Sequence, residues 1–322
     1  MIFCVKLSHD LQIQPTKRGL FFMNKAVIDA LQSRFGSGNF NFYAAEGGLP
    51  AVKLVNSFGS AAVMLHGAHV IDYTPAGAVP VLWMSEKSMF ADNEPIRGGI
   101  PVCWPWFGPD VTGKFGGHGF ARVSNWRVTG AVQTPGGEST VVMELTDSDV
   151  DAKFAPQPFK LTLTVTLGES LVVALKISNT GTADLAYSGA LHSYFNVADA
   201  SAIKVEGLED CEYCDKVINV DSVQKGAIQI DREIDRVYCR TSGIVRVADP
   251  VFDRVIRIAK AGSNSTVVWN PWIEKSKRMP DFGDEEYHTM VCVEAANAPA
   301  AGDDRILAPG AVAELRQIIS VE

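Results

Sequence analysis

Apolar residues alternate with polar ones over many short stretches of this chain. The clearest stretch is Lys160–Ile177, in which Leu161, Leu163 and Val165 alternate with threonines before the turn Gly168-Glu169-Ser170. A period of two places each set of side chains on one face of a strand, so this stretch predicts a β-hairpin with one buried face. Similar runs predict further strands at Ala51–Phe58, Ala61–Tyr73, Trp126–Val132, Thr140–Leu145, Ser201–Glu206, Ser242–Ala248, Val255–Ile258, Thr266–Trp269, Met290–Glu294 and Ala311–Val321.

One segment near the N-terminus follows a helical period instead. Val27, Ile28, Leu31 and Phe35 recur at 3.6-residue spacing and predict a short helix over Asn24–Phe35. Many short strands with almost no other helical pattern indicate an all-β protein, a large antiparallel sandwich or barrel. We therefore expect residues 1–38 to form an extension with a short helix, its first two dozen residues poorly ordered. Residues 39–322 are expected to form one domain.

The composition narrows the class of protein. Of 322 residues, 47% are hydrophobic and 20% charged, as in ordinary globular chains, and the net charge is −8. An acidic chain is a poor partner for nucleic acid or an anionic membrane, and no apolar run reaches the roughly 18 residues of a membrane span. Six sparse cysteines without a recognisable secretory signal favour a reducing, cytoplasmic setting. We expect a monomer whose partner is a small molecule.

Five segments are too unusual to be regular structural elements alone. The first, at 95–108, reads PIRGGIPVCWPWFG, and the others read HGFAR (118–122), LHSYF (191–195), EYCDK (212–216) and VCVEAAN (291–297). Arg97 stands beside paired glycines and offers a fork of donors that suits a phosphate. Trp104 and Trp106 offer flat faces on which a sugar ring can stack, although tryptophans are more often core residues.

Glu294 is the most informative single residue. It interrupts an apolar strand, and its neighbours Cys292, Ala295 and Ala296 give little sign of an exposed polar face. A buried carboxylate costs free energy unless it is paired, and such groups concentrate at functional sites. Glu294 is therefore a candidate catalytic residue.

Taken together and in this order, the segments resemble the aldose 1-epimerase (galactose mutarotase-like) superfamily. Within it they look most like the glucose-6-phosphate 1-epimerase branch, from about Asn39 to the C-terminus. The resemblance implies a large antiparallel β-sandwich and an isomerase that interconverts the α and β anomers of a phosphorylated hexose. It implies that neither a metal nor another cofactor is needed.

The resemblance also assigns roles to individual residues. His192 would be the general acid and Glu294 the general base. His118 would lie beside the sugar, and Asp215 would bind the substrate.

Arg97 and Arg122 would bind the phosphate of the substrate. Gly117 departs from the branch, in which glutamine is common at this position, so one side-chain contact to the substrate would be missing. Two alternatives remain open at this point. One is a non-catalytic carbohydrate-binding protein, and the other is a mutarotase for unphosphorylated aldoses.

Overall fold

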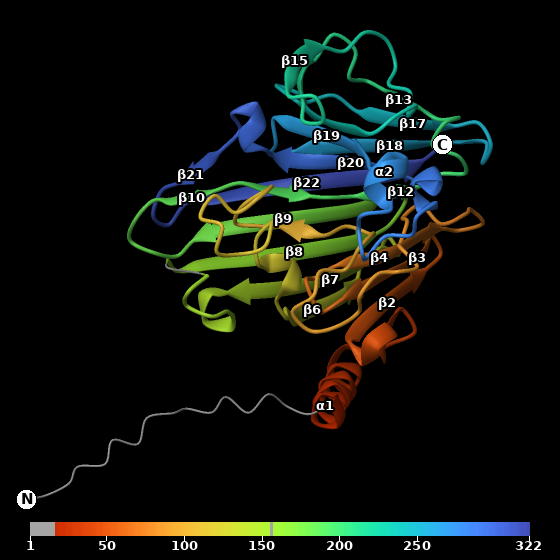
Figure 1. Cartoon of the computed structure of the whole chain (residues 1–322). Helices are drawn as coiled ribbons and strands as arrows, with labels where there is room; N and C mark the ends of the chain where they lie inside the picture. Colours follow the sequence, from red (N-terminus) through yellow and green to blue (C-terminus); the bar gives the residue numbers. More distant parts are fainter. Residues whose placement is uncertain (1–16, 155–156) are drawn as a thin grey trace, which may run out of the picture.

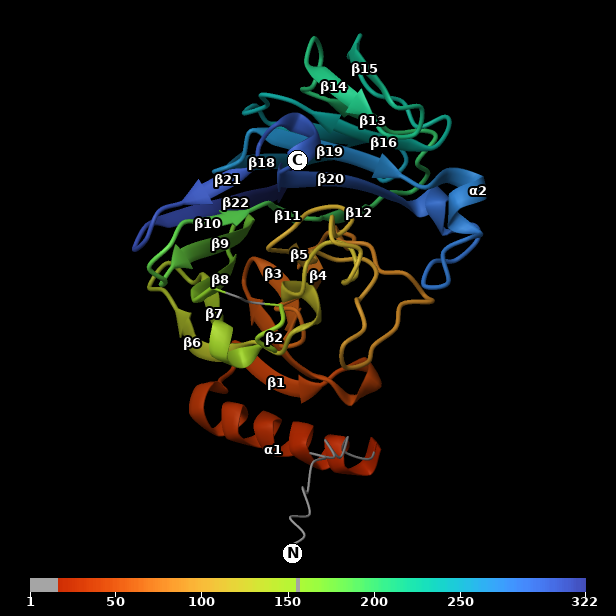
Figure 2. The same ribbon diagram turned by 60° about the vertical axis from the view of Figure 1, so that its left-hand side comes forward.

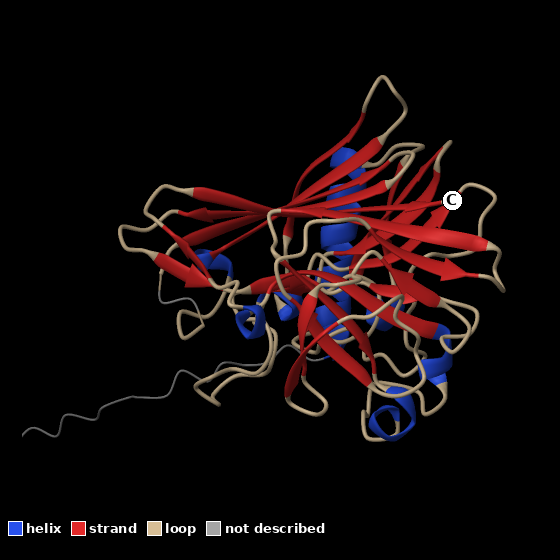
Figure 3. Ribbon diagram, turned by 90° about the horizontal axis from the view of Figure 1, so that it is seen from above, coloured by secondary structure: helices blue, strands red, loops and turns tan. Residues whose placement is uncertain are grey.

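Antiparallel β-sheets dominate the computed structural model, which describes residues 17–154 and 157–322 (Figure 1, Figure 3). Sheet I runs in the order β13-β17-β18-β22-β9-β8-β7-β6. Its strands are β6 Arg127–Gln133, β7 Ser139–Thr146, β8 Phe159–Leu167, β9 Leu171–Asn179, β13 Lys204–Glu206, β17 Val245–Asp249, β18 Arg254–Ala261 and β22 Val312–Val321.

Sheet II carries the residues that concern function. It runs in the order β15-β14-β16-β19-β20-β11-β5, and β12 also pairs with β20. Its strands are β5 Val102–Cys103, β11 Gly189–Leu191, β12 Tyr194–Asn196, β14 Glu212–Asp215, β15 Val220–Val223, β16 Ile234–Tyr238, β19 Ser265–Asn270 and β20 Met290–Asn297.

A third sheet, two helices and a short ribbon complete the fold. The third sheet holds β1 Phe40–Ala44, β2 Pro50–Asn56, β3 Gly59–Met64 and β4 Val70–Pro75, and the ribbon pairs β10 Leu185–Tyr187 with β21 Arg305–Leu307. Helix α1 (Lys17–Phe35) lies beside β1 at the end of the molecule opposite the β14–β15 hairpin (Figure 2), and α2 spans Trp272–Ser276. Single 3₁₀ turns occupy Glu46–Gly48, Ala121–Val123, Asp147–Asp149, Glu286–Thr289 and Pro299–Ala301.

Sheets I and II contact each other where β20 lies against β22. The apolar residues of both sheets, such as Leu175, Val293 and Leu315, belong to one continuous buried core. One polar link crosses this core, because the fully buried Gln317 accepts a hydrogen bond from Ser193 and donates one of 3.1 Å to the carbonyl of Val293. Its amide is therefore paired, as a buried polar group must be. The predicted all-β sandwich is confirmed.

Two local predictions were wrong. The helix begins at Lys17, seven residues before the expected Asn24, so part of the expected disordered extension is helical; residues 1–16 lie outside the described residues. The run Ala61–Tyr73 is two strands, because Gly67 and Ala68 take positive φ and turn the chain between β3 and β4.

In the described residues, no helix has the length and apolarity to cross a membrane.

Candidate active site

Strand β20 is buried on both of its faces, which explains why the residues around Glu294 are apolar. Val291, Val293 and Ala295 point into the core between the sheets, whereas Cys292 belongs to a separate apolar cluster on the other face. Alternation along a strand places Glu294 on the same face as Cys292. Glu294 is 2% exposed, and its Oε2 has no hydrogen-bond partner within the described residues. The carboxyl group is thus presented by a rigid strand to a site without protein partners for it.

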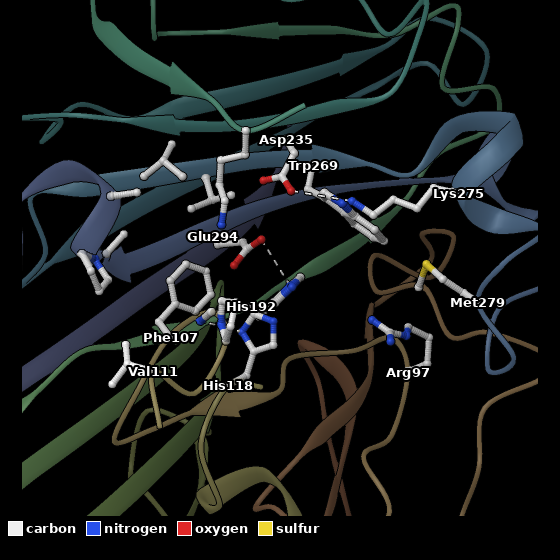
Figure 4. A pocket seen from close by; sticks show the side chains of 18 residues that line it. Arg97, Phe107, Val111, His118, His192, Asp235, Trp269, Lys275, Met279 and Glu294 are labelled. Atoms are coloured by element: carbon white, nitrogen blue, oxygen red, sulfur yellow. Dashed lines mark hydrogen bonds and ion pairs between the residues drawn. The ribbon is translucent and has the colours of Figure 1, made fainter. Parts of the chain in front are cut away.

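His192 reaches the same face from the turn between β11 and β12. Its backbone N–H donates to the carbonyl of Pro101 at 3.1 Å, and its ring stacks on that of Tyr194, with centroids 4.8 Å apart and planes 6° apart. Tyr194 in turn lies opposite Cys292 in the β12–β20 register. These contacts fix the imidazole so that its Nδ1 lies 3.4 Å from Oε1 of Glu294 (Figure 4). The structure therefore brings together the predicted acid and base, 102 residues apart in the chain.

Burial shifts the pKa values of Glu294 and His192 in opposite directions. It raises the pKa of Glu294 well above its ordinary value, and the nearby Asp235 adds to the effect while Lys216 opposes it. It lowers the pKa of His192 well below its ordinary value, and His118 and Arg97 lower it further. Both shifts favour the uncharged forms.

The pair lies on the wall of a cavity of about 550 Å³, a size that suits a small ligand. Sheet II supplies Val237 and Asp235 from β16, together with Val267 and Trp269 from β19. Figure 4 shows Asp235, Trp269 and Lys275 on one side of Glu294 and Phe107, Val111 and His118 on another. Trp269, rather than the predicted tryptophans, gives the cavity its indole wall.

Trp104 lies in the core instead. It is 1% exposed and packs on Phe120 and Phe159, with ring centroids 5.6 Å and 4.7 Å away. Trp106 does not line this cavity either. Their role as sugar platforms is therefore not supported by their positions.

Arg97 lines the cavity, as its predicted role requires. Its guanidinium contacts Asp281 through Nε at 3.0 Å and Nη2 at 2.9 Å, and its Nη1 donates to the hydroxyl of Tyr194 at 2.8 Å. A guanidinium held on three nitrogens keeps one orientation, which prepares its remaining N–H groups for a ligand. Tyr194 therefore supports Arg97 with its hydroxyl and His192 with its ring.

His118 lines the cavity, whereas Arg122 does not. The His118 ring lies 5.7 Å from that of His192, and burial with Arg122 and Arg97 nearby lowers its pKa to about 3, so it is neutral. Arg122 donates through Nη2 to the carbonyl of Gly117 at 2.8 Å, and its buried Nε has no partner in the described chain. Its predicted phosphate contact stays a prediction, and Gly117 acts here through its backbone.

Asp215 does not line the cavity, and the strand register gives the reason. It lies opposite Arg236 on the neighbouring strand β16, with Oδ2 3.3 Å from Nε of that arginine, and it also accepts the backbone N–H of Val217 at 3.0 Å. Residues 235 and 236 point to opposite faces of the sheet. Asp235 faces the cavity, and so Asp215 faces away from it.

Three lining residues were missed by the reasoning from sequence: Asp235, Lys275 and Trp269. Lys275 lies 2.9 Å from Glu233 and 3.7 Å from Asp235, which anchors its ammonium group beside the cavity. Ile234 and Val237 enclose the charged pair Asp235-Arg236, and this pattern without strict alternation is only a weak signal for a strand. Lys216, another lining residue, belongs to the unusual segment EYCDK (212–216), but the sequence alone assigns it no role.

Comparison with known proteins agrees with this geometry. Residues 50–320 match the family model of aldose 1-epimerase. Proteins provisionally named glucose-6-phosphate 1-epimerase from Cenchrus ciliaris and Escherichia coli K12 are each 36% identical to this chain, over 73% and 74% of it and over 74% and 80% of their own lengths. A solved structure from Salmonella typhimurium, provisionally described as a mutarotase, superimposes with a TM-score of 0.82 at 30% identity, covering 88% of this chain and 94% of its own. The chain belongs to the aldose 1-epimerase family, and it is an isomerase.

Proposed function

We propose that this isomerase interconverts the α and β anomers of an aldohexose 6-phosphate, with glucose 6-phosphate as the first substrate to test. The observation that carries the proposal is the buried His192–Glu294 pair, 3.4 Å apart, on a cavity that Arg97 also lines. The names of the relatives support the same substrate.

The pair supplies the two proton transfers that ring opening needs. Glu294 as carboxylate takes the proton of the C1 hydroxyl, and His192 as imidazolium gives a proton to the ring oxygen. Rotation about C1–C2 and the reverse transfers close the other anomer. Each positioned proton transfer contributes roughly 10²–10⁴-fold to the rate.

The charges around the cavity favour an anionic substrate. Arg97, Lys216 and Lys275 are cationic lining residues, against the carboxyl groups of Asp235 and Glu294, and burial raises the pKa of Glu294, which favours its uncharged form. A phosphate group accepts charge-assisted hydrogen bonds, which are stronger than neutral ones. Arg97 is the phosphate ligand that we propose first, because its orientation is fixed by Asp281 and Tyr194.

The experiment is the anomerisation of freshly dissolved α-glucose 6-phosphate, followed by NMR with the wild type and with Glu294→Gln. We expect the wild type to accelerate the approach to equilibrium and the variant to lose about 10²–10⁴-fold of that acceleration. No acceleration by the wild type would contradict the proposal, and so would a Glu294→Gln variant as fast as the wild type.

Arg97→Ala tests the substrate class. Loss of a hydrogen bond to a charged group costs about 1.5–3 kcal/mol, which raises KM for glucose 6-phosphate by about 10–100-fold and leaves unphosphorylated glucose nearly unaffected. Arg127→Ala removes an exposed arginine that pairs with Asp149 and serves as the matched control. Equal losses for both sugars would favour a mutarotase for neutral aldoses.

A further inference from the structure

A buried thiol that the proposed acid–base chemistry does not use lies beside the His192–Glu294 pair. Cys292 precedes Glu294 by two residues on β20, shares its face of the sheet and is fully buried. The Sγ atom of Cys292, a ring nitrogen of His192 and a carboxyl oxygen of Glu294 all lie within 4.8 Å of one another. Strand alternation and the stacking of His192 on Tyr194 produce this group of three different donor atoms.

We propose that Cys292, His192 and Glu294 bind a thiophilic divalent cation of the zinc class, and that this ion inhibits the enzyme by occupying its acid and its base. Sulfur, imidazole and carboxylate are the donors that Zn²⁺ takes in proteins. Calcium and magnesium prefer sets made of oxygen alone, so the thiol selects against them.

The distances suit tetrahedral coordination. Donors about 2.1 Å from a tetrahedral ion lie about 3.4 Å from one another. The Nδ1–Oε1 separation of His192 and Glu294 is 3.4 Å, and the Sγ atom of Cys292 lies within 4.8 Å of a ring nitrogen of His192 and of a carboxyl oxygen of Glu294. Side-chain movements of about 1 Å therefore complete a three-ligand site, and the fourth position is left for water on the cavity side.

Two of the three side chains hold buried polar atoms without partners. Nδ1 of His192 and Oε2 of Glu294 make no hydrogen bond within the described residues, and these residues are 9% and 2% exposed. An unpaired buried polar atom costs about 1–3 kcal/mol, which a bound ion would remove. Coordination takes the thiolate of Cys292, the carboxylate of Glu294 and an unprotonated ring nitrogen of His192, so the protons that these atoms hold leave to solvent.

The consequence is competition between the ion and the sugar. The ion takes the lone pairs of His192 and Glu294 that the proton transfers require, so an enzyme with bound metal has neither acid nor base. Cys292 contributes to metal binding alone. Its replacement is expected to separate inhibition from catalysis.

The test is a titration with Co²⁺, whose bond to a thiolate gives a charge-transfer band in the near ultraviolet. The full-length protein is used, with Cys4, Cys211, Cys214 and Cys239 replaced by serine in every sample to remove other thiols. We expect one equivalent of Co²⁺ to produce the band in this background.

Cys292→Ser is expected to abolish the band and to raise the Zn²⁺ concentration for half-inhibition at least about 100-fold, with basal activity retained. Cys103→Ser is the matched control, because among the described residues Cys103 is the other buried cysteine and it is not one of the three ligands. It should keep both the band and the inhibition. Cys292→Ala repeats the test without a hydroxyl if the serine variant does not fold.

Three results would overturn the proposal: no band in the background protein, a band that survives in Cys292→Ser, or equal inhibition by Zn²⁺ with and without Cys292. The cobalt spectrum needs no sugar. Failure of the anomerisation assay would therefore leave this test intact and would count against the proposed function alone.

Discussion

Folding moves the carboxyl group of Glu294 out of water and gives it no cationic partner at hydrogen-bond distance. It is 2% exposed, Nδ1 of His192 lies 3.4 Å from its Oε1, and burial lowers the pKa of that imidazole well below its ordinary value. Burial and Asp235 raise the pKa of Glu294 well above its ordinary value. We therefore predict that Glu294→Gln, which keeps the shape and removes the ionisation, is more stable than the wild type at neutral and alkaline pH.

The sign and the size of this stability difference follow from proton linkage. In the unfolded chain Glu294 loses its proton near pH 4.5, whereas in the folded protein it keeps the proton to a higher pH. Folding then takes up a proton, so the wild type loses about 1.4 kcal/mol of stability for each pH unit within this window. Glu294→Gln lacks this loss. The stability difference between the variant and the wild type should be small near pH 4.5 and grow with that slope as pH rises.

The assay is urea unfolding of both proteins at intervals between pH 5 and pH 8, with the difference in unfolding free energy plotted against pH. His192 titrates in both proteins, so its contribution is largely removed by the subtraction. Glu274→Gln, at an exposed glutamate whose side chain is 83% accessible, is the matched control and should give a flat difference. A flat difference for Glu294→Gln as well would refute the reasoning, because the buried carboxyl would then ionise as it does in water.

Two further predictions concern the same pocket. Lys216 lowers the pKa of Glu294, so Lys216→Met should raise the pKa of that carboxyl group. In a pH–rate profile, the alkaline limb of kcat/KM for glucose 6-phosphate should then move to higher pH. An alkaline limb that stays in place would mean that Glu294 does not set it. Tyr194→Phe removes the hydroxyl that accepts from Arg97 at 2.8 Å and keeps the ring under His192. This variant should raise KM for glucose 6-phosphate about tenfold, or about 1.4 kcal/mol, while kcat changes little. Steady-state kinetics with unphosphorylated glucose provide the comparison. An equal rise in KM for that sugar would mean that the hydroxyl serves general packing.

Much of the sandwich could be predicted, because its strands repeat an unambiguous period. Lys160–Ile177 became β8 and β9, and the run at 290–294 became the first part of β20. The pattern failed where tertiary contacts decide. The break inside Ala61–Tyr73 depends on His66 and His69, whose Nε2 atoms contact the carbonyls of Glu94 and Gly98 at 2.8 Å and 2.7 Å. Those contacts join segments about 30 residues apart, which periodicity does not detect.

The site was predictable where a residue conflicts with its surroundings. Glu294 stood out because a carboxylate is unusual in an apolar strand, and the family resemblance added His192. Asp235 could not stand out, since it lies in a segment already rich in charge, and only the register of β16 with β19 shows that it faces the cavity. Asp215 lies on the same sheet as the cavity residues but faces away from the cavity, and its position in the sequence alone could not show which face it takes.

The two-sided burial of β20 limits how this enzyme can change over time. Its alternate side chains face two different environments, one set filling the core between the sheets and the other, which includes Glu294, facing the side of the sheet on which the cavity lies. A single inserted or deleted residue in β20 would exchange the two sets, placing a carboxyl group in the hydrophobic interior and a valine at the reaction centre. Such length changes remove stability and activity in one step. The loop that carries Arg97 and the short helix α2 that carries Lys275 are free of this double constraint, so new substrate preferences can evolve there while the chemistry stays fixed.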